Sequence, residues 1–215
     1  MSSVRPFLLS IVPLALLITA TTPANADAIF NFENIAAGTV APFTDTVNGL
    51  TASVSGPISV CNVTSLNFAT LSGNAAVQGF CTPGQLGAVT IGFSSNLSSV
   101  SLDFATAGRP SAPFSLQAFE NSTPVGSLVT VNSAVPPGNF PNGEGVISFS
   151  GTFNSIVLNT VGATPGSQGG PFAVDNINAV TATSGVPEPA SVSMFAAGIA
   201  VLLVLARRAR RRQTS

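Results

Sequence analysis

Short runs in which apolar and polar residues alternate fill the chain from residue 27 to residue 180. The clearest run places Val100, Leu102 and Phe104 on one side and Ser101 and Asp103 on the other. Because successive side chains of a β-strand point to opposite faces, a period of two residues predicts strands with one buried face. Gly, Pro, Asn and Ser separate the runs, and the region has no apolar period typical of a helix. This region is therefore predicted to be all-β.

The predicted strands are short and closely spaced. They cover residues 28–33, 50–55, 58–63, 75–80, 88–93, 100–104, 114–119, 127–131, 146–149, 155–159 and 172–180. Many short strands with turn residues between them are typical of a two-sheet sandwich. The first and last strands are both strong and are expected to pair as neighbours, which favours a jelly-roll-like sandwich.

Residues 1–26 have the pattern of a cleaved secretory signal peptide. Arg5 gives the positive start, residues 7–20 are apolar, and residues 24–26 fit the small-x-small cleavage rule. We predict cleavage before Asp27, and the alternative is a retained N-terminal anchor. Residues 27–180 then form a single β-sandwich ectodomain, followed by a short Ser/Thr/Gly linker at 181–185.

The last part of the chain has three successive segments. The first is the motif Val186, Pro187, Glu188 and Pro189, in which the two prolines keep the backbone extended. Residues 190–206 carry no charge and lie at the short end of the roughly 17–25 residues that a membrane-spanning helix needs. An arginine cluster follows: Arg207, Arg208, Arg210, Arg211 and Arg212. Such a cluster keeps that end of a transmembrane helix on the cytoplasmic side.

Hydropathy and charge alone describe this tail as a single-pass C-terminal anchor with a stop-transfer flank. Its order across residues 186–212 closely resembles the PEP-CTERM sorting signal of exported proteins in Gram-negative bacteria that make exopolysaccharide. The resemblance implies a transient inner-membrane anchor and an exosortase-type processing enzyme as partner. It also implies cleavage near residues 186–189 and transfer to the cell surface or extracellular matrix.

The charge of the ectodomain is strongly acidic. Arg109 is its one basic residue, against seven acids, so its formal charge is −6 although that of the whole chain is −1. Nucleic-acid binding is excluded as a function, because Lys and Arg supply most of the affinity for phosphate.

The residue types that the chain lacks narrow its chemistry. There is no His, the commonest general base and transition-metal ligand, and no Trp or Tyr, so all aromatic residues are Phe. Sugar-binding sites usually use an aromatic ring that has a polar group. Two carboxylates can support glycoside hydrolysis, but the scattered acids form no motif, and the chain is predicted not to be an enzyme.

Cys61 and Cys81 are the only cysteines. In an exported domain an even pair most often forms a disulfide, and we predict one here. A catalytic Cys is disfavoured because the chain offers no imidazole to activate it.

Two acids are candidate metal ligands. Glu33 ends the first predicted strand and Asp175 lies in the last one. Their segments resemble the terminal motifs of carbohydrate-binding-module-like and galactose-binding-like jelly rolls, in which such residues often hold a structural Ca²⁺. Ca²⁺ accepts six to eight oxygen ligands, including carboxylates and backbone carbonyls. The alternative is that both acids are solvated or capped residues at strand edges.

The sequence therefore predicts an exported, tail-processed, non-enzymatic protein of the cell surface or extracellular matrix, associated with exopolysaccharide or biofilm. The alternative function is that of a carbohydrate-binding module that recognises a neutral glycan. A hydrolase is the third hypothesis.

Overall fold

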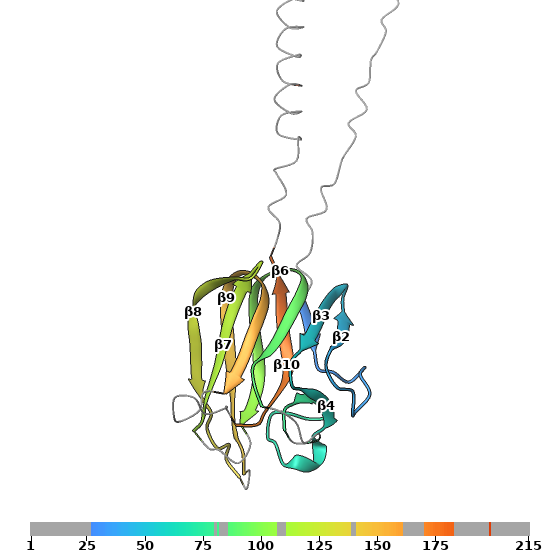
Figure 1. Cartoon of the computed structure of the whole chain (residues 1–215), viewed down its shortest axis with the longest axis vertical. Helices are drawn as coiled ribbons and strands as arrows, with labels where there is room; N and C mark the ends of the chain where they lie inside the picture. Colours follow the sequence, from blue (N-terminus) through green and yellow to red (C-terminus); the bar gives the residue numbers. More distant parts are fainter. Residues whose placement is uncertain are drawn as a thin grey trace, which may run out of the picture. The chain divides into compact units, whose positions relative to one another are not determined.

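A computed structural model describes residues 27–79, 81, 86–106, 111–138, 141–160, 170–182 and 198. All of these except Gly198 belong to one compact unit, Ala24–Ser184. Within this unit the described residues form strands and one short 3-10 helix (Figure 1). They are β1 (Asp27–Phe30), β2 (Phe43–Val47), β3 (Leu50–Ser55), β4 (Ser59–Asn62), η1 (Thr64–Leu66), β5 (Asn74–Val77), β6 (Val89–Thr106), β7 (Pro113–Glu120), β8 (Thr123–Asn132), β9 (Gly143–Thr160) and β10 (Phe172–Thr181).

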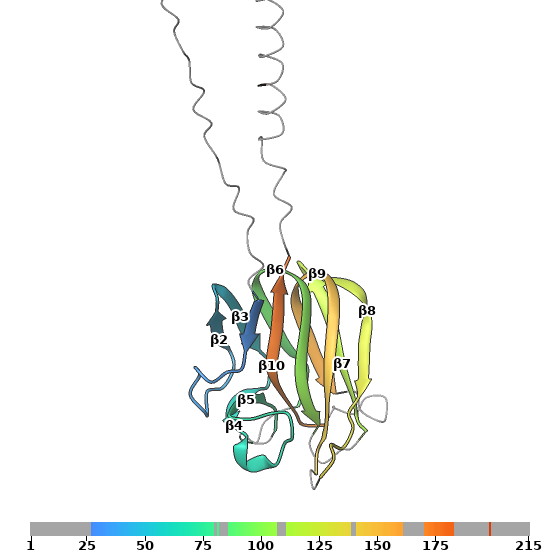
Figure 2. The ribbon, with the colours of Figure 1, turned by 180° about the vertical axis from the view of Figure 1, so that it is seen from behind.

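The strands form one antiparallel sheet that folds back on itself into two layers. Layer A has the order β8, β7, the second half of β9, the first half of β6, β3 and β2. Layer B has the first half of β9, the second half of β6, β10, β5 and β4, with β1 paired to the end of β10. The long strands β6 and β9 thus run through both layers, and β8 and β2 lie at opposite edges (Figures 1 and 2).

The two long strands, β6 and β9, cross from one layer to the other at a point where both are irregular. The β6–β9 register shifts between Gly92 and Leu97 and again before Ser99, and opposite it Gly151 of β9 has a φ of 151°. Irregularities of this kind bend strands and increase their twist. Here they turn a flat sheet into a sandwich.

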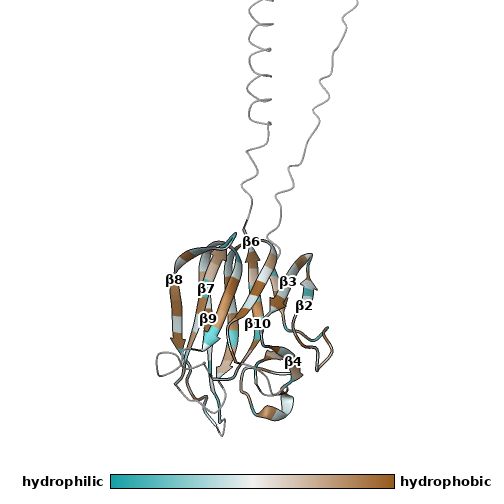
Figure 3. Ribbon diagram, in the orientation of Figure 1, coloured by the Kyte–Doolittle hydropathy of each residue, from teal (hydrophilic) through white to brown (hydrophobic). Residues whose placement is uncertain are grey.

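Phenylalanine rings fill the space between the layers. Phe104 of layer B stacks on Phe114 of layer A at 4.4 Å, and Phe172 meets Phe114 edge-on at 5.2 Å. Phe30 and Phe93 make a similar contact between the layers nearer the other end, at 6.3 Å. All of these rings except Phe93 are fully buried. Apolar and polar residues alternate along the strands, as Figure 3 shows, because one face of each layer meets this core.

The predicted all-β, two-layer, jelly-roll-like sandwich is confirmed. The pairing of the first and last strands is confirmed as well, since Phe30 is opposite Ile177 and Asp27 is opposite Val180. Two details of the prediction were wrong. The predicted strands at 88–93 and 100–104 are parts of the single strand β6, which begins at Val89, and those at 146–149 and 155–159 are parts of β9, because the corners bend these strands without ending them.

Two further corrections concern the start of the domain. β1 ends at Phe30, so Glu33 lies in the loop after the strand, beyond Phe32 with a φ of 57°. The strand β2 was missed. Its inward positions are Phe43, Asp45 and Val47, and the acid at the centre hides the apolar alternation.

Candidate functional site

Three carboxylates gather on the outer face of layer B, and we call Glu33, Asp103 and Asp175 the acidic cluster. Asp175 on β10 and Asp103 on β6 are directly paired residues of the sheet. Their strand neighbours Val174 and Phe104 point into the core, so the two acids point outward. Glu33 reaches the same place from the loop after β1, and its charge acts on Asp175.

A loop between β4 and β5 covers this face, and we call its residues 63–73 the cap loop. Its Val63 and Leu71 pack on Ala105 and Ala173 of the sheet in a small second core. At its end the backbone N–H of Ser72 points to Asp175 Oδ2 at 3.5 Å. The next contact comes from the first residue of β5, Asn74, whose N–H donates to Glu33 Oε1 at 2.9 Å. Both predicted ligands therefore meet the same short stretch of backbone.

The sheet is irregular where the acidic cluster lies. The register of β10 against β6 shifts between Asp175 and Asn178, and Asn176 has a φ of 49°. The Asn176 N–H donates to Asp175 Oδ1 at 2.8 Å, and its side-chain amide donates to Asp103 Oδ2 at 2.9 Å. The bulge thus places donors between two like charges, which would otherwise repel each other across the ladder.

Asp175 has a strongly perturbed titration. It is 1% exposed, and burial raises its pKa from 3.8 to about 7. The N–H groups of Asn176 and Ser72 oppose this increase, while the charges of Asp103 and Glu33 add to it. A buried carboxylate beside two other acids is stabilised in its charged form by a cation.

The chemistry of the cluster fits a hard cation with oxygen ligands. The N–H contact at Asp175 Oδ2 is long, 3.5 Å, so this oxygen retains acceptor capacity. Within the described ranges no group of three or more His, Cys, Asp or Glu side chains is arranged to hold a metal. A Ca²⁺ ion here would therefore need Glu33 and Asp175 together with backbone, amide or water oxygens, a mixture that Ca²⁺ accepts.

A fourth acid, Glu144 of β9, holds the middle of the cap loop. Its two carboxylate oxygens accept the N–H groups of Ala69 and Thr70, each at 2.7 Å, and the Thr70 hydroxyl also donates, at 2.6 Å. Glu144 is 5% exposed. Charge-assisted hydrogen bonds of this kind are roughly twice as strong as neutral ones. Glu144 therefore has a structural role in the loop.

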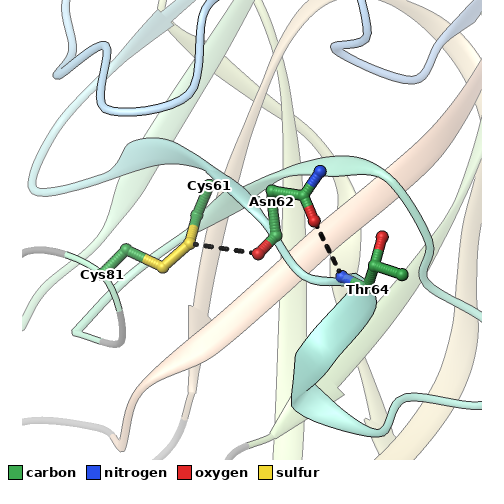
Figure 4. Close-up of a disulfide and its surroundings, with 4 residues drawn as sticks. All are labelled: Cys61, Asn62, Thr64 and Cys81. Carbon is green, nitrogen blue, oxygen red and sulfur yellow. Dashed lines mark hydrogen bonds between the residues drawn. A yellow bond between two sulfur atoms is a disulfide. The ribbon is translucent and has the colours of Figure 1, made fainter.

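The predicted disulfide between Cys61 and Cys81 is confirmed (Figure 4). The two Cα atoms are 6.1 Å apart, within the usual range for a disulfide. Cys61 is the β4 residue that packs into the small second core, and Cys81 follows β5. The bond thus links β4 to the segment after β5 and closes a covalent loop that contains the cap loop.

Sequence reasoning missed the contributions of Asp103, Glu144 and the cap loop. The outward direction of Asp103 is readable from the alternation in β6, but its partner strand is not. Glu144 follows a Gly/Pro/Asn-rich segment, and nothing in the sequence marks the backbone N–H groups that it binds.

The predicted signal peptide, the sorting motif Val186–Pro189 and the arginine cluster Arg207–Arg212 lie outside the described residues, as does the predicted helix at 190–206 apart from Gly198. Across the described ranges we find no helix that is both long and apolar enough to cross a membrane.

Comparisons with known proteins bear on the tail and on the fold. Loose structural similarity links the sandwich to several solved structures. One is the K2 cleaved adhesin domain of Lys-gingipain, with a TM-score of 0.44 and 11% identity over 73% of this chain and 99% of that one. Another is a point mutant of a family 29 carbohydrate-binding module, with a TM-score of 0.34 and 13% identity over 76% and 97%. The family 11 carbohydrate-binding module of a Clostridium thermocellum cellulase has a TM-score of 0.35 and 12% identity over 74% and 96%.

No curated protein sequence matches the chain. Residues 185–212 do match the model of the PEP-CTERM protein-sorting motif, which includes Val186, Glu188 and all five tail arginines. This motif implies a C-terminal membrane anchor before processing. The chain thus carries a PEP-CTERM protein-sorting motif, the mark of an exported protein that an exosortase sorts and processes.

Proposed function

We propose that this chain is a non-enzymatic structural protein of the cell surface or extracellular matrix of a Gram-negative bacterium, associated with exopolysaccharide. The sorting motif at residues 185–212 is the observation that carries the proposal, because it directs export and processing. The composition supports a structural role: the chain has no His, and Glu33, Glu144 and Asp175 accept hydrogen bonds from the backbone.

We further propose that Glu33 and Asp175 hold a structural Ca²⁺ that fastens the cap loop to layer B. The support is the meeting of both carboxylates at the Ser72–Asn74 backbone. The raised pKa of Asp175 is consistent with a place for a cation. Outside the cell, where Ca²⁺ is plentiful, even a weak site of the extracellular type, about 10⁻⁴–10⁻³ M, would be occupied.

The experiment that tests the main proposal is the intact mass of the mature protein in membrane and extracellular fractions of its native cells. A chain that starts at Asp27 and ends near residues 186–189 is expected in the extracellular fraction. A mass two hydrogens below the fully reduced value will report the disulfide. A product that retains the arginine cluster and stays in the inner membrane would overturn the sorting step and leave only a membrane anchor.

Binding of a neutral glycan is the second candidate function, and the outer face of layer A favours it. By the strand register, this face carries hydroxyl and amide side chains in rows, such as Thr44, Ser53 and Ser155 across β2, β3 and β9. An open hollow of about 300 Å³ lies at its β2–β3 edge, lined by Pro42, Phe43, Thr44, Ser53, Val54 and Ser55. Uncharged hydroxyl-bearing surfaces suit neutral polyols, although this face lacks the Tyr or Trp that commonly contacts sugar rings.

A glycan array with the mature protein separates the two functions. Saturable binding that is lost in the T44A/S53A double variant but kept in the S148A variant would support the second function. Ser148 is the control because it is an exposed serine on the outer face of layer B. The absence of any reproducible glycan binding would remove this candidate and leave the structural role.

A further inference from the structure

The outer edge of β8 has no paired strand among the residues that the structure describes. β8 pairs with β7 on one side, and no described strand pairs with it on the other. It lies at the edge of the sandwich in both views (Figures 1 and 2). Leu128 in this strand is 55% exposed and Thr130 is exposed as well. An unpaired strand edge presents free N–H and C=O groups to another chain.

The hydrogen-bond pattern identifies which groups face outward. Just beyond the pair Pro113–Asn132, the N–H of Ser133 donates to the carbonyl of Ala112. Pro113 has no N–H, so its pair with Asn132 is the non-hydrogen-bonded type. Hydrogen-bonded and non-hydrogen-bonded pairs alternate along an antiparallel ladder. Val131 therefore bonds to β7, whereas the backbone groups of Thr130 and Asn132 point away from the sheet.

Two of the other outer edges, those of β4 and β2, are blocked. Along β4, the N–H groups of Gly38 and Ala41 donate to the carbonyls of Val60 and Ile58, and the Val60 N–H donates to the carbonyl of Thr39. This extra segment occupies the edge. The edge strand β2 is short and carries the inward-facing Asp45. Short strands and inward charges are both devices that discourage edge pairing.

The charge pattern of β8 differs from that of the rest of the domain. Its sequence, Thr123–Asn132, contains no charged residue, while the ectodomain as a whole carries a formal charge of −6. Two copies that meet at this edge therefore place no acid of one strand opposite an acid of the other. The straight part of the strand, Val129–Asn132, is also rich in β-branched residues, which suit a sheet.

We propose that β8 is a self-association edge, at which a second copy of this chain pairs antiparallel and joins two layer A sheets into one. A two-fold axis at Thr130 places its outward-pointing N–H and C=O groups opposite those of the other copy. Thr130 then exchanges hydrogen bonds with Thr130 of the other copy. Val129 and Val131 become neighbours across the axis, so apolar side chains that are half-exposed in one copy cover each other. This interface is independent of the calcium site and of any glycan.

A cysteine substitution in the full-length chain, produced in its native cells, tests the arrangement. Paired Cα atoms at hydrogen-bonded antiparallel positions lie about 5.5 Å apart, which a disulfide spans. Because Cys61 and Cys81 already pair with each other, the T130C variant adds one free thiol. We expect most of this variant to run as a reducible dimer. The matched control is T44C, an exposed Thr on the edge strand β2, which should stay monomeric.

A second variant tests the native interface without a covalent bond. The Thr130 N–H points away from β7, so T130P removes an intermolecular donor and leaves the β7–β8 ladder intact. By native mass spectrometry the processed protein is expected at twice the mass of one chain, and T130P at the mass of one chain with an unchanged circular dichroism spectrum. If T130P disturbs that spectrum, T130K, which places like charges face to face, takes its place.

Three results would overturn the proposal. They are equal cross-linking of T130C and T44C, a processed wild-type protein that is monomeric at high concentration, and a T130P or T130K variant that remains dimeric. The last would place the interface elsewhere, and a dimer that forms only with a different protein would make β8 a hetero-pairing edge.

Discussion

The buried carboxylate of Asp175 should make the stability of this domain depend on pH in a way that Ca²⁺ removes. In the folded state its pKa is about 7, against 3.8 as the ordinary value. A raised carboxyl pKa means that the folded protein holds a proton that the unfolded chain has released. Its favourable effect is complete below pH 3.8 and is lost as the pH rises through about 7.

The expected magnitude follows from the pKa difference. Each pH unit between the two values costs about 1.4 kcal/mol of unfolding free energy, so the full interval gives an upper bound of about 4 kcal/mol. In a calcium-free buffer the loss between pH 5 and pH 7 is about 2 kcal/mol, because the carboxyl is still half protonated at pH 7, and this corresponds to roughly 4–8 °C in melting temperature for a domain of this size. A bound cation stabilises the deprotonated carboxylate and should flatten this slope.

The assay is denaturant unfolding of the processed protein at several pH values, with Ca²⁺ and with a chelator, for the wild type and for D175N. Asn keeps the shape of the side chain and removes its titration. D175N should therefore be more stable than the wild type in chelator at pH 7, and Ca²⁺ should no longer stabilise it. Burial also raises the pKa of Asp45, so the informative quantity is the difference between the two proteins.

Two outcomes would refute this reasoning. If wild type and D175N lose stability in parallel from pH 5 to pH 7, Asp175 does not titrate in this interval. If the chelator has no effect on the wild type at pH 7, Glu33 and Asp175 do not form a calcium site, and the cluster is a structural network only.

Three further predictions concern the cap loop. The E144Q variant replaces one of the two charged acceptors with an amide nitrogen, and it should lose about 1–3 kcal/mol in denaturant unfolding; a neutral result would mean that the loop is held without this carboxylate. A Cβ on Gly73, which has a φ of 65°, would overlap the carboxylate of Glu33. Gly38, with a φ of 92°, has open space around it. G73A should therefore lose more stability than G38A, which carries only backbone strain of order 1 kcal/mol, and should weaken Ca²⁺ binding in calorimetry; equal losses would count against the contact. Replacing Cys61 and Cys81 together by Ala should lower stability by about 3 kcal/mol, and a thermal melt matching that of the oxidised wild type would show that the bond adds no stability.

The sequence predicted the fold class because the core requires alternating apolar residues in every strand. The alternation of Val100, Leu102 and Phe104 is read directly from the chain, and all three are buried in the common core. The ends of the strands were harder to predict from the sequence. A strand that turns a corner between layers, as β6 does near Leu97, continues as one strand although its apolar pattern and its pairing with β9 are interrupted there. The strand β2 was missed because an acid, Asp45, occupies an inward position.

The candidate site was predictable where it depends on the two ends of the chain and unpredictable elsewhere. Glu33 follows the first strand and Asp175 lies in the last one, and the pairing of β1 with β10 brings those strands together. The disulfide was predictable because only one pairing exists. Asp103 faces Asp175 through a register that is set by long-range pairing, and no short sequence pattern encodes such a register.

Three described acids on the outer face of layer B, namely Glu33, Glu144 and Asp175, have the same structural role, and this explains why they do not read as a catalytic set. Glu144, Asp175 and Glu33 accept N–H groups from residues 69–70, 72 and 74 in turn, so they follow the backbone of the cap loop along its second half. The disulfide closes a covalent loop that contains the same segment. Each of these devices stabilises one small core, in which Leu71 and Val63 cover the sheet. Groups that act on one core are coupled, so the effects of losing the proposed Ca²⁺, the disulfide and the Glu144 carboxylate are expected to be non-additive: once one loss has released the loop, the other contacts stabilise it little.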